Sequence, residues 1–440
     1  MNTSARTDVG TARGRSYRSL LADGSFARIW LIGGVAGTLR WLEMLAVGVF
    51  TFQTTGSPAA VALMTFMRLG PMLFAGLPMG ALAERHDRKR LMEIGLAVLC
   101  LANLGVALLA LADRLALWHL ALAALLNGIF FTSEFPVRRT MIGEIVGTPR
   151  LAAAMALDSM TSNATRALGP VLGGVLLEAT GLAGTFLLGA FGYGLALLLA
   201  RPLAYRPASP PRRVAILAGM REGLGFAARS RTVRTTLLIT VIFNVFGFAY
   251  IALVPVVGER WLGLGATLIG VLMAAEGTGS LFGAILVGWL ARPARYTRIY
   301  VGGTLLFLGA IVVFALSRDF TLSLVALFVS GFGVAGFAVM QSTLTFLTAP
   351  PRLRARLMGV LTVAIGTGPL GMLVIGWIAE VADAPDAILL FAGLGALSLV
   401  ALLLLSLDYL RIRDPAARAQ ADGSTSSRQA TPSSSDDTAG

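Results

Sequence analysis

The sequence predicts an all-α membrane protein of twelve transmembrane helices, arranged as two pseudo-symmetric halves of six. Three observations support this fold class. Of the 440 residues 56% are hydrophobic, with a mean hydropathy of +0.77, whereas about 45 to 50% of an ordinary soluble domain is apolar. Apolar runs of about 20 residues, long enough to cross a bilayer, recur along the chain. The basic residues gather on one side of those runs.

Each predicted span is a mostly apolar run of about 18 residues or more, which crosses about 30 Å of hydrocarbon as a helix. Continuous apolar runs favour helices over barrel strands, in which hydrophobic residues alternate with polar ones. The predicted spans are 28–52, 58–81, 91–111, 115–134, 153–178, 183–201, 235–256, 264–290, 298–317, 320–341, 353–378 and 387–409.

The remaining segments complete the predicted organisation. A cytoplasmic N-terminal tail (1–24), which does not resemble a cleaved signal peptide, precedes the N-terminal half (25–201). A central cytoplasmic loop (202–234) leads to the C-terminal half (235–410), and the tail 411–440 is predicted to be disordered. The central loop is predicted to contain a basic amphipathic helix on the inner leaflet, with a solvated linker as the alternative.

The distribution of arginine predicts the orientation. Of the 36 basic residues, 30 fall in tails and loops that are cytoplasmic if both termini lie inside, and three fall within spans. The outer loops hold only Arg114, Arg260 and Arg318. This is the positive-inside pattern, and it explains the net charge of +13 without a nucleic-acid partner, for which a clustered basic domain is expected.

No catalytic or cofactor motif is present in the sequence. Cys100 is the single cysteine, so a disulfide framework and a cysteine metal cluster are excluded. His86 and His119 lie apart, without the spacing of a metal site or a carboxylate relay, and no GxxxxGK[ST] phosphate loop occurs. We therefore expect neither an enzyme nor an ATP-driven pump, and no cofactor or metal.

Two short motifs repeat half a chain apart. GPVLGG (169–174) in the fifth span is echoed by GPLG (368–371) in the eleventh, and GALAER (80–85) after the second span by GWLAR (288–292) after the eighth. Each echo links a span to the one six places later. Two parallel halves with a pathway between them are typical of secondary transporters.

The stretch GALAERHDRKR, which begins at Gly80, resembles the signature of the major facilitator superfamily. The twelve-span layout extends the resemblance over nearly all of 25–410. Glu84 stands where the family usually has Asp, and Asp87 where it usually has Gly. Asp87 and the stretch EFPVRR (134–139) resemble the branch of enterobactin exporters and related siderophore or drug exporters.

The resemblance implies an inner gate formed by Gly80, Glu84, Arg85, Arg88 and Glu134. Glu84 is expected near the cytoplasmic start of the eleventh span, where a helix N-terminus favours negative charge. Arg88 is expected to pair with Glu134, taken as the acid at the inner end of the fourth span. Such contacts would hold the halves together on the inner side. The alternative is a solvated loop that only sets the topology.

The GPVLGG stretch resembles the antiporter signature of the fifth span, which implies export through Gly169, Pro170, Gly173 and Gly174. Small residues also let membrane helices approach closely, so a packing role is expected in either case. Thr165 stands where the signature has Gly, and the fourth span lacks the arginine that drug antiporters usually carry.

Charges within the spans are the candidate chemistry, because each costs about 2.5 to 3.5 kcal/mol to insert. We predict that Arg40 pairs with Glu43, and that Asp158, Ser162 and Arg166 form one stripe. The predicted cavity residues are Arg40, Arg68, Asn163, Arg166, Asn244 and Gln341, with aromatic walls from Trp41, Phe66, Phe243, Phe248 and Phe337. Structural ion pairing and ordinary packing are the alternatives.

Glu276 is predicted to carry the proton, with Asp158 and Glu43 as alternatives. Its neighbours in AAEGTGSLFG are small and weakly polar, and no basic residue lies one helical turn away, whereas Glu43 has Arg40. A carboxyl group without a neighbouring cation can exchange a proton more readily. Closure of the cavity could bring an arginine from the opposite half against it and expel the proton.

These observations predict a proton-coupled exporter of a small amphiphilic compound, such as a drug or siderophore, that works by alternating access. We expect a monomer in the inner membrane with both termini in the cytoplasm, whose partners are the substrate, protons and the lipid bilayer. Proton-coupled uptake of a small metabolite is the first alternative. A membrane receptor or scaffold that transports nothing is the alternative from another class.

Overall fold

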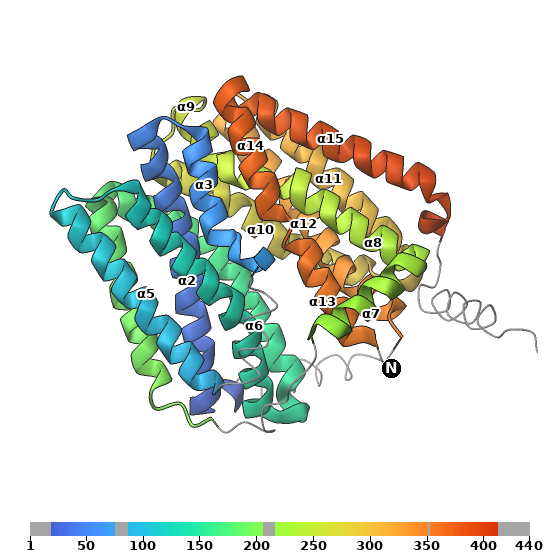
Figure 1. Cartoon of the computed structure of the whole chain (residues 1–440), viewed down its shortest axis with the longest axis horizontal. Helices are drawn as coiled ribbons and strands as arrows, with labels where there is room; N and C mark the ends of the chain where they lie inside the picture. Colours follow the sequence, from blue (N-terminus) through green and yellow to red (C-terminus); the bar gives the residue numbers. More distant parts are fainter. Residues whose placement is uncertain (1–18, 75–86, 206–215, 351–352, 412–440) are drawn as a thin grey trace, which may run out of the picture.

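A computed structural model describes residues 19–74, 87–205, 216–350 and 353–411, and within these ranges all regular elements are helical (Figure 1). This part of the chain contains ten helices that are long and apolar enough to cross a membrane, and one shorter apolar helix, Pro58–Phe74. The prediction of an all-helical membrane protein is confirmed.

The elements follow one another through two groups of helices. The first group is α2 (Gly24–Thr55), α3 (Pro58–Leu69), α5 (Arg88–Leu111) and α6 (Leu117–Ala200). The second begins with α7 (Ile216–Arg229), α8 (Arg231–Ile242) and α9 (Val254–Arg260) and continues through α10 (Ala266–Leu290), α11 (Tyr296–Leu316), α12 (Phe320–Thr348), α13 (Arg354–Ile365), α14 (Gly368–Ala382) and α15 (Ala384–Leu405). Figure 1 shows the first group on one side of the molecule and the second on the other.

The long element α6 is three helices joined at two glycines. Gly147 has φ 69° and Gly181 has φ 65°, in the left-handed region that glycine enters without a steric penalty. The chain therefore reverses at each position, and α6 divides into the segments 117–146, 149–180 and 182–200. The turn at Gly181 contains a single non-helical residue.

This geometry corrects the predicted boundary of the fourth span. The sequence placed its end at 134 and a loop over 135–152, but the helix continues to the turn at Gly147. The prediction was wrong because hydropathy counts the charges of Glu134 and Arg138 as signs of solvent. Both side chains are buried in the structure, where they neutralise each other.

Irregular backbone interrupts one helix of the second group. A π-helical turn (Phe243–Gly247) and a 3₁₀ turn (Phe248–Leu253) separate α8 from α9. Such turns inside a helix often occur at functional sites. Here they place Asn244 and Tyr250 in the interior, next to α10 and α11.

Several loop acids are helix caps. The Asp87 carboxylate accepts hydrogen bonds from the backbone N–H groups of Lys89 and Arg90 at the start of α5. Asp23 caps α2 in the same way, and Asp319 caps α12. Capping satisfies N–H groups that the helix itself leaves free, and it gives Asp87 a structural purpose in its charged loop.

The central segment contains the amphipathic helix that the sequence favoured. Helix α7 packs against the start of α13 through a small apolar cluster that includes Phe226 and Leu357, and Glu222 forms an ion pair with Arg356. The predicted disordered tail lies outside the described residues beyond Arg411.

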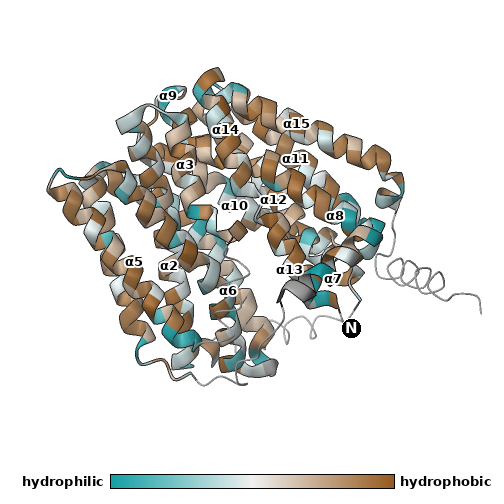
Figure 2. Cartoon of the chain, viewed as in Figure 1, coloured by the Kyte–Doolittle hydropathy of each residue, from teal (hydrophilic) through white to brown (hydrophobic). Residues whose placement is uncertain are grey.

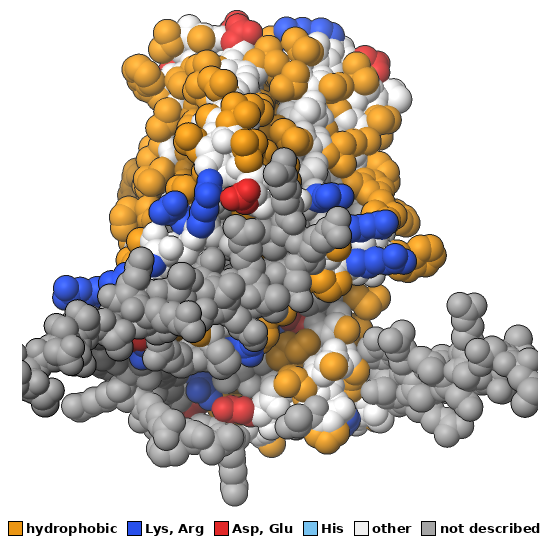
Figure 3. All heavy atoms as spheres, turned by 90° about the vertical axis from the view of Figure 1, so that its right-hand side faces the viewer, with side chains coloured by type: hydrophobic (Ala, Val, Ile, Leu, Met, Phe, Trp, Pro, Cys, Tyr) orange, Lys and Arg blue, Asp and Glu red, His pale blue; other side chains and the backbone are white. Residues whose placement is uncertain are grey.

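Hydrophobic residues cover most of the helix surfaces (Figure 2). Figure 3 shows hydrophobic side chains over the upper part of one face, with Lys and Arg side chains gathered below them. A broad apolar surface next to a basic zone is what a membrane protein with positively charged inner loops presents.

Candidate functional site

An ionic network joins α2 to two segments of α6. Arg40 Nη2 lies 3.4 Å from Glu134 Oε2, and Glu134 also binds Arg138 one helical turn later. Arg138 in turn donates to Asp158, and Arg139 Nε lies 3.2 Å from the second oxygen of Asp158. Glu134, Arg138 and Asp158 are fully buried. Each buried carboxylate therefore has a cationic partner, which is the condition for keeping charge in the interior.

A second buried group centres on Glu43. Arg68 Nη2 lies 3.3 Å from Glu43 Oε2 and donates to the Arg40 carbonyl oxygen at 2.8 Å. Asn127 donates to the same carboxylate oxygen at 3.0 Å and to the hydroxyl of Tyr193. The predicted pair between Arg40 and Glu43 is not formed, because each finds its partner on another helix. This group resembles a structural ion pair more than an exposed binding site.

An ion pair connects the two groups of helices. Arg166 on α6 donates to Glu276 on α10, and the hydroxyl of Tyr250 donates to the other carboxylate oxygen. Glu276 is buried, while 18% of the Arg166 side chain is exposed. Trp41 and Phe248 lie beside the guanidinium, with ring centres 5.4 and 5.5 Å from its central carbon. Asp158 and Arg166 of the predicted stripe therefore bind different partners. Asp158 binds Arg138 and Arg139, whereas Arg166 binds Glu276.

The second group of helices has a neutral interior beside this pair. Thr240 shares a hydrogen bond of 2.9 Å with Tyr300 and accepts one of 3.1 Å from Gln341. The side chain of Asn244 donates to the Thr240 carbonyl oxygen. Phe243 stacks on Phe337 with ring centres 3.6 Å apart. The predicted cavity residues Asn244 and Gln341 are therefore buried within the second group of helices. The predicted wall residues Phe243 and Phe337 are buried there too.

Two predicted cavity residues lie apart from these networks. The Asn163 side chain donates to the Ser159 carbonyl oxygen of its own helix at 3.1 Å. Phe66 is partly buried on α3. Among the described hydrogen bonds, none joins the Asn163 side chain to the charged groups.

Arg88, a residue of the predicted inner gate, has other partners in the structure than the predicted Glu134. Arg88 Nη1 lies 2.9 Å from Glu144 Oε1 and donates to the Tyr205 hydroxyl at 2.9 Å. The predicted pairing with Glu134 is not formed in this structure, where Glu134 binds Arg40 and Arg138. The helix continues past Glu134 to the turn at Gly147, so Glu144 is the acid near the end of that segment. Gly80, Glu84 and Arg85 lie outside the described residues.

Tyr205 completes this contact just beyond the end of α6. Burial, together with its hydrogen bond to Glu144, raises the pKa of the Tyr205 phenol. The phenol is therefore protonated at neutral pH and can donate to Glu144. All three members come from the first group of helices, so this contact fastens that group at its basic end.

The GPVLGG stretch is a close crossing point of three helices. A Cβ atom on Gly169 would lie 2.5 Å from Trp41 Cβ, and one on Gly173 would lie 2.6 Å from the Leu42 carbonyl oxygen. Gly174 faces the backbone of Ala266 on α10, and Gly270 of α10 faces the Pro170 carbonyl oxygen. No side chain fits at these contacts, as expected for glycines at a helix interface.

Two hydrogen-bonded contacts at the end of the molecule away from Arg88 and Glu144 were not predicted. The Ser57 hydroxyl lies 2.6 Å from Glu380 Oε2, and the backbone N–H of Thr267 donates to Glu178 at 3.0 Å. Glu178 is the last residue of the predicted fifth span, and Glu380 lies two residues beyond the predicted eleventh span. Their partners are a hydroxyl and a backbone group, which no charge pattern reveals.

Other contributors were also missed. Arg138 and Arg139 were counted as loop residues, although the spacing of Glu134 and Arg138 by one helical turn is a signal for a pair. Phe131 lies under Arg40 at 4.0 Å and Phe135 under Arg139 at 4.2 Å. Among the described residues, no group of three His, Cys, Asp or Glu side chains could hold a metal ion.

Comparison with known proteins identifies relatives over almost the whole chain. Residues 16–432 match the family model described as transmembrane secretion effector. The enterobactin exporter EntS of Shigella boydii serotype 18 is 28% identical over 388 residues, which cover 88% of this chain and 92% of the relative. EntS of Escherichia coli O139:H28 matches with the same identity and coverage.

Solved transporter structures share the fold. A POT family transporter in complex with 5-aminolevulinic acid has a TM-score of 0.71 at 11% identity, over 87% of this chain and 96% of that one. A bacterial homologue of the human lysosomal transporter Spinster has a TM-score of 0.62 at 16% identity, over 90% and 98% of the two chains.

Proposed function

Because the chain belongs to the family of transmembrane secretion effectors, within the major facilitator superfamily, we propose that it exports an acidic amphiphilic compound in exchange for protons. Its similarity to enterobactin exporters supports export and makes siderophore-like compounds the first candidates. The observation that carries the proposed coupling is the ion pair between Arg166 and Glu276, which joins the two groups of helices.

The proposed architecture has twelve spanning helices in two halves. The break at Gly181 makes two helices of the stretch Pro149–Ala200, and the short helix Pro58–Phe74 crosses with the others. We place both termini in the cytoplasm of a cell with this protein in its inner membrane, because the basic loops then lie inside. A monomer contains both halves and so has all the parts that alternating access requires.

The conformation is proposed to be open toward the cytoplasm. The hydrogen bonds from Ser57 to Glu380 and from Thr267 to Glu178 join the halves at the end away from the basic loops. The pair of Arg166 and Glu276 joins them at greater depth. At the basic end, Arg88 contacts partners in its own half. Among the described residues, which do not include 75–86, these hydrogen bonds between the halves lie at one end, as in one of the two states of an alternating-access transporter.

Proton coupling follows if the halves separate at Arg166 and Glu276 when the outer end opens. In the proposed cycle, the pairing of Glu276 with Arg166 in the present state follows release of a proton from Glu276 toward the cytoplasm. Separation removes this cation, and Glu276 then takes up a proton from outside. Closure of the outer end returns Arg166 to Glu276 and expels the proton inward. One proton enters for each cycle in which substrate leaves.

The substrate is proposed to carry negative charge beside an apolar or aromatic part. Arg40 and Arg139 keep 18% and 36% of their side chains exposed, and each guanidinium lies over a phenylalanine ring. An exposed guanidinium can bind a carboxylate or a catecholate oxygen, and the neighbouring ring can pack against an aromatic ligand.

Metabolite profiling tests the direction and the substrate together. In cells that lack the protein, we expect a compound to disappear from the medium and accumulate inside. Inverted membrane vesicles should then take up that compound when a pH difference is imposed, and vesicles without the protein should not. Depletion of a compound inside the mutant cells would indicate uptake instead, and vesicles with no substrate-dependent flux would indicate a scaffold.

A further inference from the structure

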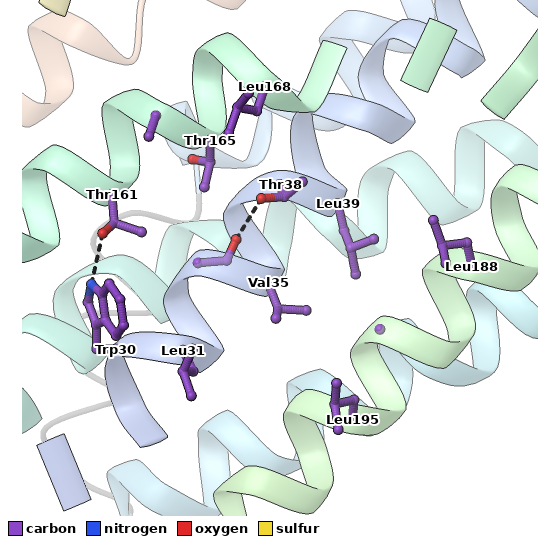
Figure 4. A pocket seen from close by; sticks show the side chains of 13 residues that line it. Trp30, Leu31, Val35, Thr38, Leu39, Thr161, Thr165, Leu168, Leu188 and Leu195 are labelled. Atoms are coloured by element: carbon purple, nitrogen blue, oxygen red, sulfur yellow. Dashed lines mark hydrogen bonds between the residues drawn. The ribbon is translucent and has the colours of Figure 1, made fainter. Parts of the chain in front are cut away.

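An apolar groove runs along α2, between this helix and two segments of α6 (Figure 4). Its volume is about 470 Å³. Four leucines on its walls, which include Leu168 and Leu195, are 40 to 58% exposed. In Figure 4, side chains of α2 lie between those of the segments 149–180 and 182–200. The aliphatic side chains that form the walls are Leu31, Val35, Leu39, Leu168, Leu188 and Leu195.

The polar groups in the groove are already engaged. Trp30 donates its indole N–H to the Thr161 hydroxyl at 2.8 Å, and the Thr38 hydroxyl donates to the Gly34 carbonyl oxygen at 2.9 Å. The Thr165 hydroxyl donates to the carbonyl oxygen of Ser162. A ligand in this groove therefore gains little from polar groups of its own, so the walls favour a hydrocarbon.

The length of the groove fits one leaflet. Its α2 wall runs from Leu31 to Leu39, a rise of about 12 Å at 1.5 Å per residue. One leaflet, which is half of a hydrocarbon core of about 30 Å, has a similar thickness of about 15 Å. The groove therefore matches a lipid chain in a single leaflet, next to the end of α2 where the basic loops lie.

A cation lies at the foot of the groove. Arg28 precedes Leu31 by about one turn on α2, and its Nη1 donates to the Pro202 carbonyl oxygen at 3.1 Å. Among the described residues, no carboxylate forms an ion pair with this guanidinium. Arg201, which is exposed, precedes Pro202 directly. The positive charge at the level expected for headgroups is thus available to an anion.

We infer that an anionic phospholipid occupies this groove, with one acyl chain along α2 and its phosphate at Arg28. The site is separate from Arg166 and Glu276, and the inference does not depend on the transport reaction. Only the assignment to the inner leaflet depends on the proposed orientation.

Lipid titration of the purified, delipidated protein tests the headgroup contact. In native mass spectrometry, phosphatidylglycerol should bind more tightly than phosphatidylcholine with identical chains. Arg28→Gln should weaken phosphatidylglycerol binding about fivefold, because one basic residue contributes about 1 kcal/mol to anionic lipid binding, and should remove the preference. Arg295→Gln, which changes an exposed arginine at the start of α11, is the matched control and should change neither.

Filling the groove tests the chain contact. Leu195→Trp should weaken binding of both lipids, whereas Leu101→Trp on the exposed face of α5 should not. Phosphatidylglycerol with a photoreactive acyl chain should label peptides that contain 31–39 and 188–195 in the unaltered protein. Labels confined to other helices, a retained preference in Arg28→Gln, or equal effects of the two tryptophans would overturn the inference.

Discussion

The two groups of helices that meet between α6 and α10, which we propose are the two halves of the transporter, place different chemistry in their interiors. The first half contains five arginines and three carboxylates in linked ion pairs. The second contributes one carboxylate, Glu276, beside hydroxyl and amide groups and stacked phenylalanines. We expect the ion pairs to exchange partners when a charged ligand or a proton arrives, and the neutral network to keep its hydrogen bonds. The first half is therefore suited to recognise charge, and the second to supply a rigid wall with one titratable group.

The largest effect is expected from the single acid of the neutral half. Glu276→Gln imitates the protonated form, so it should still exchange substrate across vesicles but should no longer concentrate it under a pH difference. Glu93→Gln removes an acid that pairs with Lys89 at the start of α5, and should transport normally. If Glu276→Gln still drives uphill transport at the wild-type rate, coupling lies elsewhere, with Asp158 or Glu43 as the next acid to test.

The stability of the first half should depend strongly on the balance of its buried charges. Asp158→Asn leaves Arg138 and Arg139 without the carboxylate that both contact, and breaking a buried pair costs about 3 to 5 kcal/mol. We expect the free energy of unfolding in detergent to fall by that amount. Asp113→Asn, at an exposed turn position with φ 52° that Asn tolerates, should change it little. A loss for Asp158→Asn below about 1 kcal/mol would show that the network rearranges freely.

Charge recognition should follow the exposed arginine of the ionic half. Arg139→Gln should lower kcat/KM for anionic substrates by at least about tenfold, since a hydrogen bond to a charged group contributes about 1.5 to 3 kcal/mol. Cationic substrates should change little. Vesicle uptake of matched anionic and cationic compounds measures the ratio, with Arg295→Gln as the control. Equal losses for both classes would assign Arg139 to structure alone.

The smallest effect is expected in the neutral network. Thr240→Val removes hydroxyl contacts with Tyr300 and Gln341 and should lower the free energy of unfolding by about 1 kcal/mol, with transport unchanged. Thr343→Val, which removes only an exposed bond to the backbone of its own helix, provides the comparison. A loss of coupling in Thr240→Val would mean that the second half also changes partners during transport.

The helical fold was predictable from sequence, whereas the pairing of its charges was not. Long apolar runs identify helices, and sequence spacing finds neighbours on one helix, which is why Arg40 was expected to bind Glu43. The structure gives them Glu134 and Arg68 instead, from other helices. Hydropathy also ended the fourth span at Glu134, since it cannot distinguish a charge paired inside a bundle from one in water.

Sequence reasoning came nearer at the interface between the halves. The absence of a cation near Glu276 in its own helix led to the expectation of one from the opposite half, and the structure places Arg166 there. No sequence pattern indicated that Tyr250 binds the same carboxylate. It reaches Glu276 from the segment where π-helical and 3₁₀ turns replace the regular helix, and hydrophobic periodicity does not report such turns.

The turn at Gly181 also bears on how the protein is made. A ribosome delivers the chain to the membrane from its N-terminus, and separate helices can enter one after another when a flexible loop joins them. Here one residue joins the segments 149–180 and 182–200, so the second must turn back as soon as the first has crossed. We expect these segments to be integrated as a hairpin, and a glycosylation tag placed at Gly181 to reduce membrane integration more than the same tag between α11 and α12.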